Sequence, residues 1–197
     1  MIKIAHRINT HEGLAAIPQE WGVEIDVRYD NRTHDLYLNH DPGDGEALKE
    51  YLEHFKHRFV VFNIKEAGIE ARCIKLAEDF GIPKENFFLL DVEFPYLYRA
   101  SRKEGIKEIA VRFSEAEPVE MAEAQRGLVD WVWIDTNTKL PLDQDTVARL
   151  QGFKTCLVSP DRWGRPQDIP AYREKMKELN FEPDAVMVGF EHRALWD

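Results

Sequence analysis

Short apolar runs alternate with helix-like segments from one end of the chain to the other. Several of these runs are almost continuously apolar, as is typical of strands that are buried on both faces of a parallel sheet. The pattern predicts eight strands, at residues 3–5, 23–29, 58–64, 87–92, 108–113, 131–135, 155–159 and 185–189.

Segments with helical periodicity lie between the predicted strands, and strands that alternate with helices are typical of parallel βαβ units. In 67–81 apolar side chains recur at helical spacing, and Gly81 stands where such a helix would end. The clearest helical segments are 45–56, 67–81, 120–128, 143–152 and 172–180.

Eight such repeats close most naturally into a (β/α)8 TIM barrel. About 250 residues is usual for that fold, and this chain has 197, so we expect a compact α/β barrel with short loops. The segment 191–197 is too short for a full eighth helix. A doubly wound open sheet is the alternative architecture. Because no linker or low-complexity tract interrupts the chain, we expect one domain over residues 1–197.

The composition limits the classes of function. The formal net charge is -10, so the surface as a whole repels nucleic acid and anionic membranes, and an anionic substrate needs local cations or a metal. No apolar stretch approaches the roughly 20 residues of a membrane span, and the first residues do not resemble a signal peptide. We therefore expect a cytoplasmic protein without membrane insertion. Cys73 and Cys156 fit two buried thiols better than a disulfide.

Two carboxylates in the second predicted strand point to a metal site. Glu24 and Asp26 are two residues apart, so their side chains share one face of the strand. In a barrel that face is the interior, and ionised groups are rarely buried without a partner. A divalent cation is one such partner, and oxygen ligands suit Mg²⁺ or Ca²⁺. The alternative is an internal salt bridge from these carboxylates to Arg28 or Lys65.

Other polar residues stand near the ends of the predicted strands, where the active site of a barrel gathers. Asn63 could give the metal a carbonyl oxygen, and Lys65 could bind a phosphate. Taken alone, His6-Arg7 is more often a surface pair, and His40-Asp41-Pro42 an ordinary turn. The remaining candidates for substrate contacts or for supporting the site are Arg28, Asp91, Arg112, Asp135 and Arg162.

Three motifs together resemble the glycerophosphodiester phosphodiesterase superfamily of phospholipase C-like TIM barrels. They are A-H-R at 5–7, G-V-E-I-D-V-R at 22–28 and L-N-H-D-P at 38–42. The third strand of that family usually ends in Glu-x-Lys or Asp-x-Lys, which aligns with Asn63-Ile64-Lys65. The match is specific over residues 5–65 and looser beyond, and it resembles a small, divergent bacterial branch.

The resemblance implies a role for each matching residue. Glu24 and Asp26 would be metal ligands, and His6 and His40 would be the general acid and base. Arg7 and Lys65 would bind the non-bridging oxygens of the phosphate. This chain departs from the family at Asn63, which replaces the third acidic ligand, and at Ile8, which replaces a glycine.

These observations favour a hydrolase that cleaves a small glycerophosphodiester-like substrate with Mg²⁺ or Ca²⁺ and two histidines. Because Asn63 removes one formal charge, the alternative is a barrel that has lost catalysis and only binds a phosphorylated ligand. A third hypothesis is an aldolase or isomerase that uses Lys65 as a Schiff base. The acidic neighbours of Lys65 disfavour it, because they would keep the amine protonated.

Overall fold

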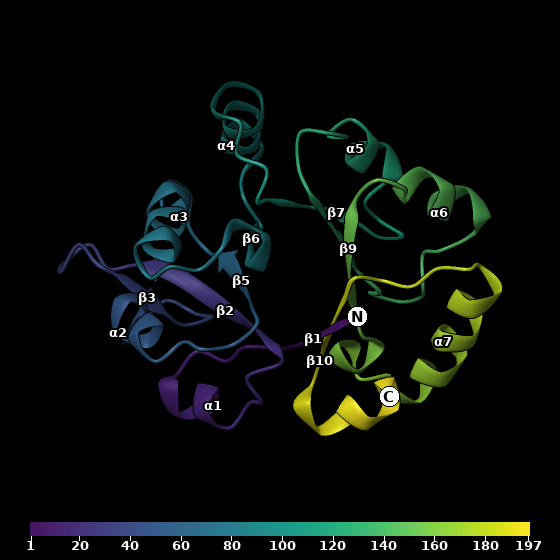
Figure 1. The fold of residues 1–197 in the computed structure, drawn as a ribbon, viewed down its shortest axis with the longest axis horizontal. Helices are drawn as coiled ribbons and strands as arrows, with labels where there is room; N and C mark the ends of the chain where they lie inside the picture. The colour runs from purple at the N-terminus through teal and green to yellow at the C-terminus, as the bar shows by residue number, and fades with distance from the viewer. The chain divides into compact units, whose positions relative to one another are not determined.

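In a computed structural model of the protein, which describes all residues 1–197, the chain divides into two compact units (Figure 1). The N-terminal unit is Ile4–Ile109, and the C-terminal unit is Met1–Lys3 with Ala110–Asp197. In both units parallel strands are followed by helices. The expectation of one domain over 1–197 stays a prediction.

All eight predicted strands form, and no strand end differs from its predicted position by more than two residues. Every residue of β5, β6, β8 and β10 is buried, which explains why these segments are continuously apolar. The parallel strands are β1 (Ile2–Ala5), β2 (Gly22–Tyr29), β5 (Phe59–Ile64), β6 (Phe87–Leu90), β7 (Ala110–Phe113), β8 (Trp131–Ile134), β9 (Lys154–Val158) and β10 (Ala185–Val188).

The N-terminal unit pairs its parallel strands in chain order. β1 pairs with β2, β2 with β5 and β5 with β6. An isolated parallel bridge then joins Leu89 to Ile109. In a doubly wound sheet the order of the strands reverses at an inner strand. No such reversal occurs within this unit.

The C-terminal unit repeats the same arrangement. β7 pairs with β8, β8 with β9 and β9 with β10, all parallel and in chain order. The backbone N–H of Ile2 donates to the carbonyl of Asp184 at 2.7 Å, just before β10. After β10, residues Phe190–Trp196 form a 3-10 helix, η5.

Four of the five predicted helices are shorter in the structure, whereas α7 (Ile169–Glu178) begins three residues earlier than predicted. Gly81 lies just beyond α3 with φ +70°, as a residue that ends a helix does. α4 was not predicted, because the sequence FPYLYR carries a proline and no helical period. The α-helices are α1 (His11–Ala15), α2 (Leu48–Glu53), α3 (Glu70–Asp79), α4 (Phe94–Arg99), α5 (Val119–Glu123), α6 (Gln144–Leu150) and α7 (Ile169–Glu178). Single-turn helices are η1 (Lys84–Asn86), η2 (Ala100–Glu104, a π-helix), η3 (Pro160–Trp163) and η4 (Pro166–Asp168).

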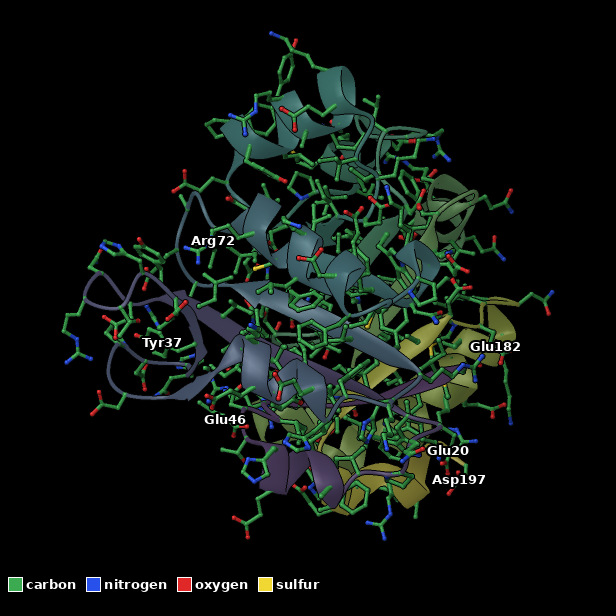
Figure 2. All side chains as sticks on the ribbon, turned by 60° about the vertical axis from the view of Figure 1, so that its left-hand side comes forward. Glu20, Tyr37, Glu46, Arg72, Glu182 and Asp197 are labelled. Atoms are coloured by element: carbon green, nitrogen blue, oxygen red, sulfur yellow. The ribbon has the colours of Figure 1, made fainter.

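Two short antiparallel strands, β3 (Leu36–Leu38) and β4 (Glu46–Ala47), extend the sheet beside β2. Figure 2 labels Tyr37 on β3 and Glu46 on β4, both on its left-hand side. Glu46 accepts a hydrogen bond from the backbone N–H of His11 at 2.8 Å and so ties β4 to the start of α1. The loop between β3 and β4 carries His40.

Aromatic side chains fix β5 against β6 inside the N-terminal unit. The rings of Phe62 and Phe87 meet edge to face at 5.8 Å, and those of Phe59 and Phe88 meet at 5.6 Å. All four are buried. Such packing gives the strand ends that carry the polar residues a rigid support.

Cys73 and Cys156 are both buried and neither forms a disulfide, as the sequence favoured. No helix of the structure is long and apolar enough to cross a bilayer.

Candidate metal and phosphate site

Four polar side chains meet where β2 and β5 run side by side. Glu24 and Asp26 project from the same face of β2 and are 1% and 0% exposed. Asn63 is the register partner of Asp26 on β5 and is also buried, while Lys65 follows the end of that strand. The predicted convergence of these residues is therefore present within the N-terminal unit.

Glu24 is bound by groups from both neighbouring strands. Its Oε1 accepts from Nδ2 of Asn63 at 2.8 Å, and its Oε2 accepts from the backbone N–H of Arg7 at 2.8 Å. Nε2 of His6 lies 3.8 Å from the same Oε2. Burial, together with the negative charge of Asp26, raises the pKa of Glu24 to about 7. This carboxyl group can therefore change its charge near neutrality.

The pKa of Asp26 is shifted in the opposite direction from that of Glu24. Its Oδ1 lies 2.9 Å from Nζ of Lys65, and its Oδ2 accepts from Nδ2 of Asn9 at 2.9 Å. Burial alone would raise the pKa of Asp26, but the bonds from Asn9 and Lys65 outweigh it and lower the pKa below its ordinary value. The internal salt bridge considered from the sequence is thus observed with Lys65, and Asp26 is ionised at neutral pH.

Arg28 donates hydrogen bonds to the loop that carries His40. Its Nε and Nη2 donate to the carbonyl oxygen of His40 at 3.1 and 2.8 Å, and its Nη1 pairs with Glu66 at 2.9 Å. The ring of His40 is 40% exposed, and its Nδ1 lies 3.0 Å from Oδ1 of Asp41. Arg28 therefore positions the backbone of the β3–β4 loop and does not pair with the two buried carboxylates.

The backbone is strained at two of the strand ends. Arg7 after β1 and Asp91 after β6 have φ values of 54° and 61°, in the left-handed region that disfavours residues with a Cβ atom. Each such residue typically costs about 1–2 kcal/mol, and such strain clusters at functional sites. The hydrogen bond from Arg7 N to Glu24 stabilises the first of these turns. Both side chains are exposed.

The chemistry of the ligand set fits an oxygen-bound cation. Oδ1 of Asn63 is buried and has no hydrogen-bond partner, while Nδ2 of the same amide donates to Glu24. No three His, Cys, Asp or Glu side chains of the chain group as a metal site. The buried amide oxygen of Asn63 is a further oxygen beside Glu24. Mg²⁺ and Ca²⁺ accept such oxygens.

Comparisons with known proteins identify the fold of the chain. No family model and no curated protein matches the sequence. Solved structures do match. A glycerophosphodiester phosphodiesterase from Agrobacterium tumefaciens superposes with a TM-score of 0.63 at 15% identity, over 95% of this chain and 96% of that one. The chain has the fold of the glycerophosphodiester phosphodiesterases.

Two further structures agree. A phosphodiesterase from Oleispira antarctica, in complex with the product sn-glycerol-3-phosphate, matches with a TM-score of 0.65 at 17% identity, over 100% of this chain and 97% of that one. A glycerophosphoryl diester phosphodiesterase from Parabacteroides distasonis matches at 0.63 and 12%, over 94% and 81%. The shared fold confirms the predicted TIM-barrel class and agrees with the resemblance drawn from the motifs.

The remaining candidates belong to the C-terminal unit, where Arg112 and Asp135 form an ion pair. Nη1 of Arg112 lies 2.9 Å from Oδ2 of Asp135, at the ends of β7 and β8. Arg162 lies in η3, and its Nε is buried without a hydrogen-bond partner. Asp135 also accepts a hydrogen bond from the indole of Trp163 at 2.9 Å.

Asn9 is the member of the site that the sequence did not reveal. It donates to the side chain of Asp26 and accepts from the backbone N–H of Asp26 at 2.8 Å. These two bonds tie the loop after β1 to β2. An asparagine before the N-cap Thr10 gives no periodic signal in the sequence, and only the parallel pairing of β1 with β2 brings it next to Asp26.

Proposed function

We propose that the protein is a phosphodiesterase that cleaves a small glycerophosphodiester-like substrate with the help of Mg²⁺ or Ca²⁺. The observation that carries this proposal is the cluster of two buried carboxylates, a buried amide and an ammonium group beside His6. The glycerophosphodiester phosphodiesterase fold supports the same reaction class. Because the similar Oleispira protein holds sn-glycerol-3-phosphate, we expect a product of that type here.

The charges of the site suit a phosphodiester anion. Glu24, Asp26 and Oδ1 of Asn63 would hold the divalent cation, which when bound supplies positive charge that neutralises the substrate and stabilises the transition state. An ammonium group carries three N–H donors, and the pair with Asp26 occupies one donor of Lys65. The others would bind non-bridging oxygens of the phosphate, together with the exposed guanidinium of Arg7.

The two histidines would move the protons. If Nδ1–H of His40 donates to Asp41, Nε2 carries a lone pair and can act as a base. One histidine would accept the proton of the attacking hydroxyl as the new oxygen–phosphorus bond forms. The other would give a proton to the departing alkoxide as the old bond breaks, so protons balance over the step. The attacker is water or a hydroxyl of the substrate, which would give a cyclic phosphate first.

A second candidate function is phosphate-ligand binding without turnover. Asn63 points its amide nitrogen at Glu24, and Lys65 already pairs with Asp26. The carboxylates are thus partly satisfied by the protein itself, which would lower the affinity for a cation. The Schiff-base alternative loses support, because Lys65 is held in an ion pair and ammonium is not a nucleophile.

The test is turnover of a panel of diesters, including bis(p-nitrophenyl) phosphate and glycerophosphocholine, with Mg²⁺, Ca²⁺ or Mn²⁺ and with chelator. We expect turnover that depends on the cation, and His6→Ala and His40→Ala should each lower kcat by about 10²–10⁴. His54→Ala, which changes an exposed histidine at the end of α2, is the matched control and should leave kcat unchanged.

The outcomes separate the candidates. No turnover with any cation, combined with saturable binding of sn-glycerol-3-phosphate, would favour the binding protein. Turnover that both histidine variants retain would remove His6 and His40 from the mechanism. Turnover that persists undiminished in chelator would remove the cation.

A further inference from the structure

We infer that Glu66 is a positioning residue, which acts through Arg28 to hold His40 in place for proton transfer. This inference rests on the proposed function, since His40 has a role in catalysis only there. Glu66 lies outside the three motifs that carry the family resemblance. Its role follows from how the loop that carries His40 is attached to the rest of the N-terminal unit.

The imidazole of His40 has little support of its own. Its ring is 40% exposed, and the carboxylate beside it, that of Asp41, is 85% exposed. A contact between two such exposed side chains contributes little free energy and holds an orientation only weakly. The position of the imidazole therefore depends on the backbone from which it projects.

That backbone is attached to β2 on both sides of the imidazole. Before His40, the backbone N–H of Asn39 donates to the carbonyl of Asp26 at 3.1 Å. At His40 itself, the carbonyl oxygen accepts from Nε and Nη2 of Arg28 at 3.1 and 2.8 Å. Hydrogen bonds from a charged donor are stronger than those between neutral groups, so Arg28 provides the stronger of the two attachments.

Glu66 fixes the guanidinium that makes this attachment. Its Oε1 lies 2.9 Å from Nη1 of Arg28, whose side chain is only 13% exposed. A charged group with so little contact with water needs a partner of opposite charge. Without Glu66, the neighbouring carboxylate on the same face of β2 is that of Asp26, two residues earlier. A turn of Arg28 toward Asp26 would draw the guanidinium away from the carbonyl of His40.

Glu66 is itself held in place by the residues around it in the chain. It directly follows Lys65, whose Nζ lies 2.9 Å from Oδ1 of Asp26. Two residues after Glu66, the backbone N–H of Gly68 donates at 2.8 Å to Oε2 of Glu70, which is 1% exposed. The segment that carries Glu66 is thus fixed on both sides and can anchor the loop between β3 and β4.

The pair of Arg28 and Glu66 therefore joins two parts of the proposed site that must keep a fixed separation. Lys65 would bind the phosphate, and His40 would move a proton. A displacement of about 1 Å can lower a rate by about 10²-fold. Loss of the pair should therefore lower kcat and change KM little, because Lys65 and Arg7 would still bind the phosphate.

The rigidity of the peptide after His40 tests the attachment without any substrate. The carbonyl of His40 and the N–H of Asp41 belong to one peptide plane, so the ¹⁵N order parameter of Asp41 reports on it. We expect about 0.85 in the parent, and less than about 0.6 in Glu66→Ala and in Arg28→Ala. Glu66→Gln keeps an oxygen acceptor for Arg28 and should stay near the parent value. Glu53→Ala, which removes an exposed glutamate of α2, is the matched control and should change nothing.

Turnover of bis(p-nitrophenyl) phosphate tests the catalytic role. Glu66→Ala should lower kcat about tenfold and Arg28→Ala about 10²-fold, with KM within about twofold of the parent value. Glu66→Gln should recover most of the loss. In a His40→Ala background, Glu66→Ala should lower kcat no further, because a residue that acts through His40 has nothing left to position.

The outcomes separate this inference from the proposed function. A parent protein that does not cleave the diester counts against the function, and the order parameter of Asp41 still decides whether Glu66 holds the loop. The inference is overturned if Glu66→Ala leaves that order parameter at the parent value, or if it lowers kcat equally with and without His40. If Arg28→Ala fails to fold, Arg28→Lys keeps the charge without the planar fork and should show the same loss of rigidity.

Discussion

At the scale of single residues, the two carboxylates show what the sequence can and cannot predict. Their shared face follows from the two-residue period of a strand, so the position of Glu24 and Asp26 was predicted correctly, whereas their role as metal ligands stays a prediction. Their hydrogen-bond partners were not all predictable. Asn9 and the backbone of Arg7 reach them from a loop whose path depends on how β1 pairs with β2. Only the tertiary structure supplies that path.

Two hydrogen bonds join Asn9 to Asp26 and form a clamp between the loop after β1 and strand β2. This clamp leads to the first prediction. Asn9→Ala removes a donor to a buried carboxylate and an acceptor for a backbone N–H, so we expect a loss of about 1–3 kcal/mol in the free energy of unfolding. It should also raise the pKa of Asp26, because a hydrogen bond that lowers this pKa is lost. Urea unfolding and an NMR titration of the Asp26 carboxyl measure the two effects.

The matched control for this clamp is Asn31→Ala, which truncates an exposed asparagine on the loop after β2. It should leave both quantities unchanged. A value for Asn9→Ala that equals that of the control would mean that the clamp contributes nothing to the site.

Asn63 gives the second prediction. Asn63→Asp replaces the N–H donor of Glu24 with a third carboxylate, which repels Glu24 and Asp26 without a cation and strengthens the ligand set with one. In chelator we expect a lower melting temperature than that of the parent, with about 2–4 °C lost for each kcal/mol. Excess Mg²⁺ or Ca²⁺ should raise the melting temperature of the variant by more than it raises that of the parent.

Asn63→Ala provides the comparison, because it removes the donor without adding a charge. It should lose stability in chelator and gain less than the parent from the cation. Equal gains in all three proteins would show that the cation does not bind at this site.

At the scale of elements, strands were easier to predict than helices. Buried parallel strands such as β5 can be recognised in the sequence by a continuous apolar run. The ends of short helices depend instead on local caps. β3 and β4 were missed because they have only three and two residues, too few to show a period. The segment 45–56 therefore looked like one helix, although its first residues belong to β4 and the helix spans Leu48–Glu53.

The capping box of α6 carries the third prediction. Oδ1 of Asp143 accepts from the backbone N–H of Thr146, and Oγ1 of Thr146 accepts from the backbone N–H of Asp143, both at 2.8 Å. α6 has seven residues, too few to be stable alone. Asp143→Ala should therefore lower the free energy of unfolding by about 0.5–2 kcal/mol, measured by urea unfolding. Asp143→Ser keeps a capping oxygen and should recover most of the loss; equal effects of the two variants would contradict a capping role.

At the scale of the whole molecule, the repeated rhythm of strand and helix was enough to predict the fold class. In each unit four parallel strands pair in chain order, and the number and spacing of the apolar runs were enough to predict them. The division of the chain into two units was not predictable from composition, because it falls inside a strand and at the start of another. It separates Lys3 from Ile4 within β1 and Ile109 from Ala110 before β7.

The last prediction concerns whether these two units unfold together. β1 contributes residues to both units, so separate unfolding of one unit would break a strand that the other unit uses. We therefore expect the chain to unfold as one domain. Each unit contains one buried cysteine, Cys73 in the N-terminal unit and Cys156 in the C-terminal unit, and the unmodified protein thus carries a reporter for each.

Pulse labelling with N-ethylmaleimide across a urea series, read for each cysteine by peptide mass spectrometry, measures the opening of both units in the same molecules. In the folded protein Cys73 should react slowly, because burial blocks access and raises the pKa of its thiol, so little thiolate forms. One domain requires both thiols to become reactive at the same urea midpoint, and this midpoint should match that of circular dichroism. If Cys73 and Cys156 react at different midpoints, the units unfold independently, and the single-domain prediction is wrong.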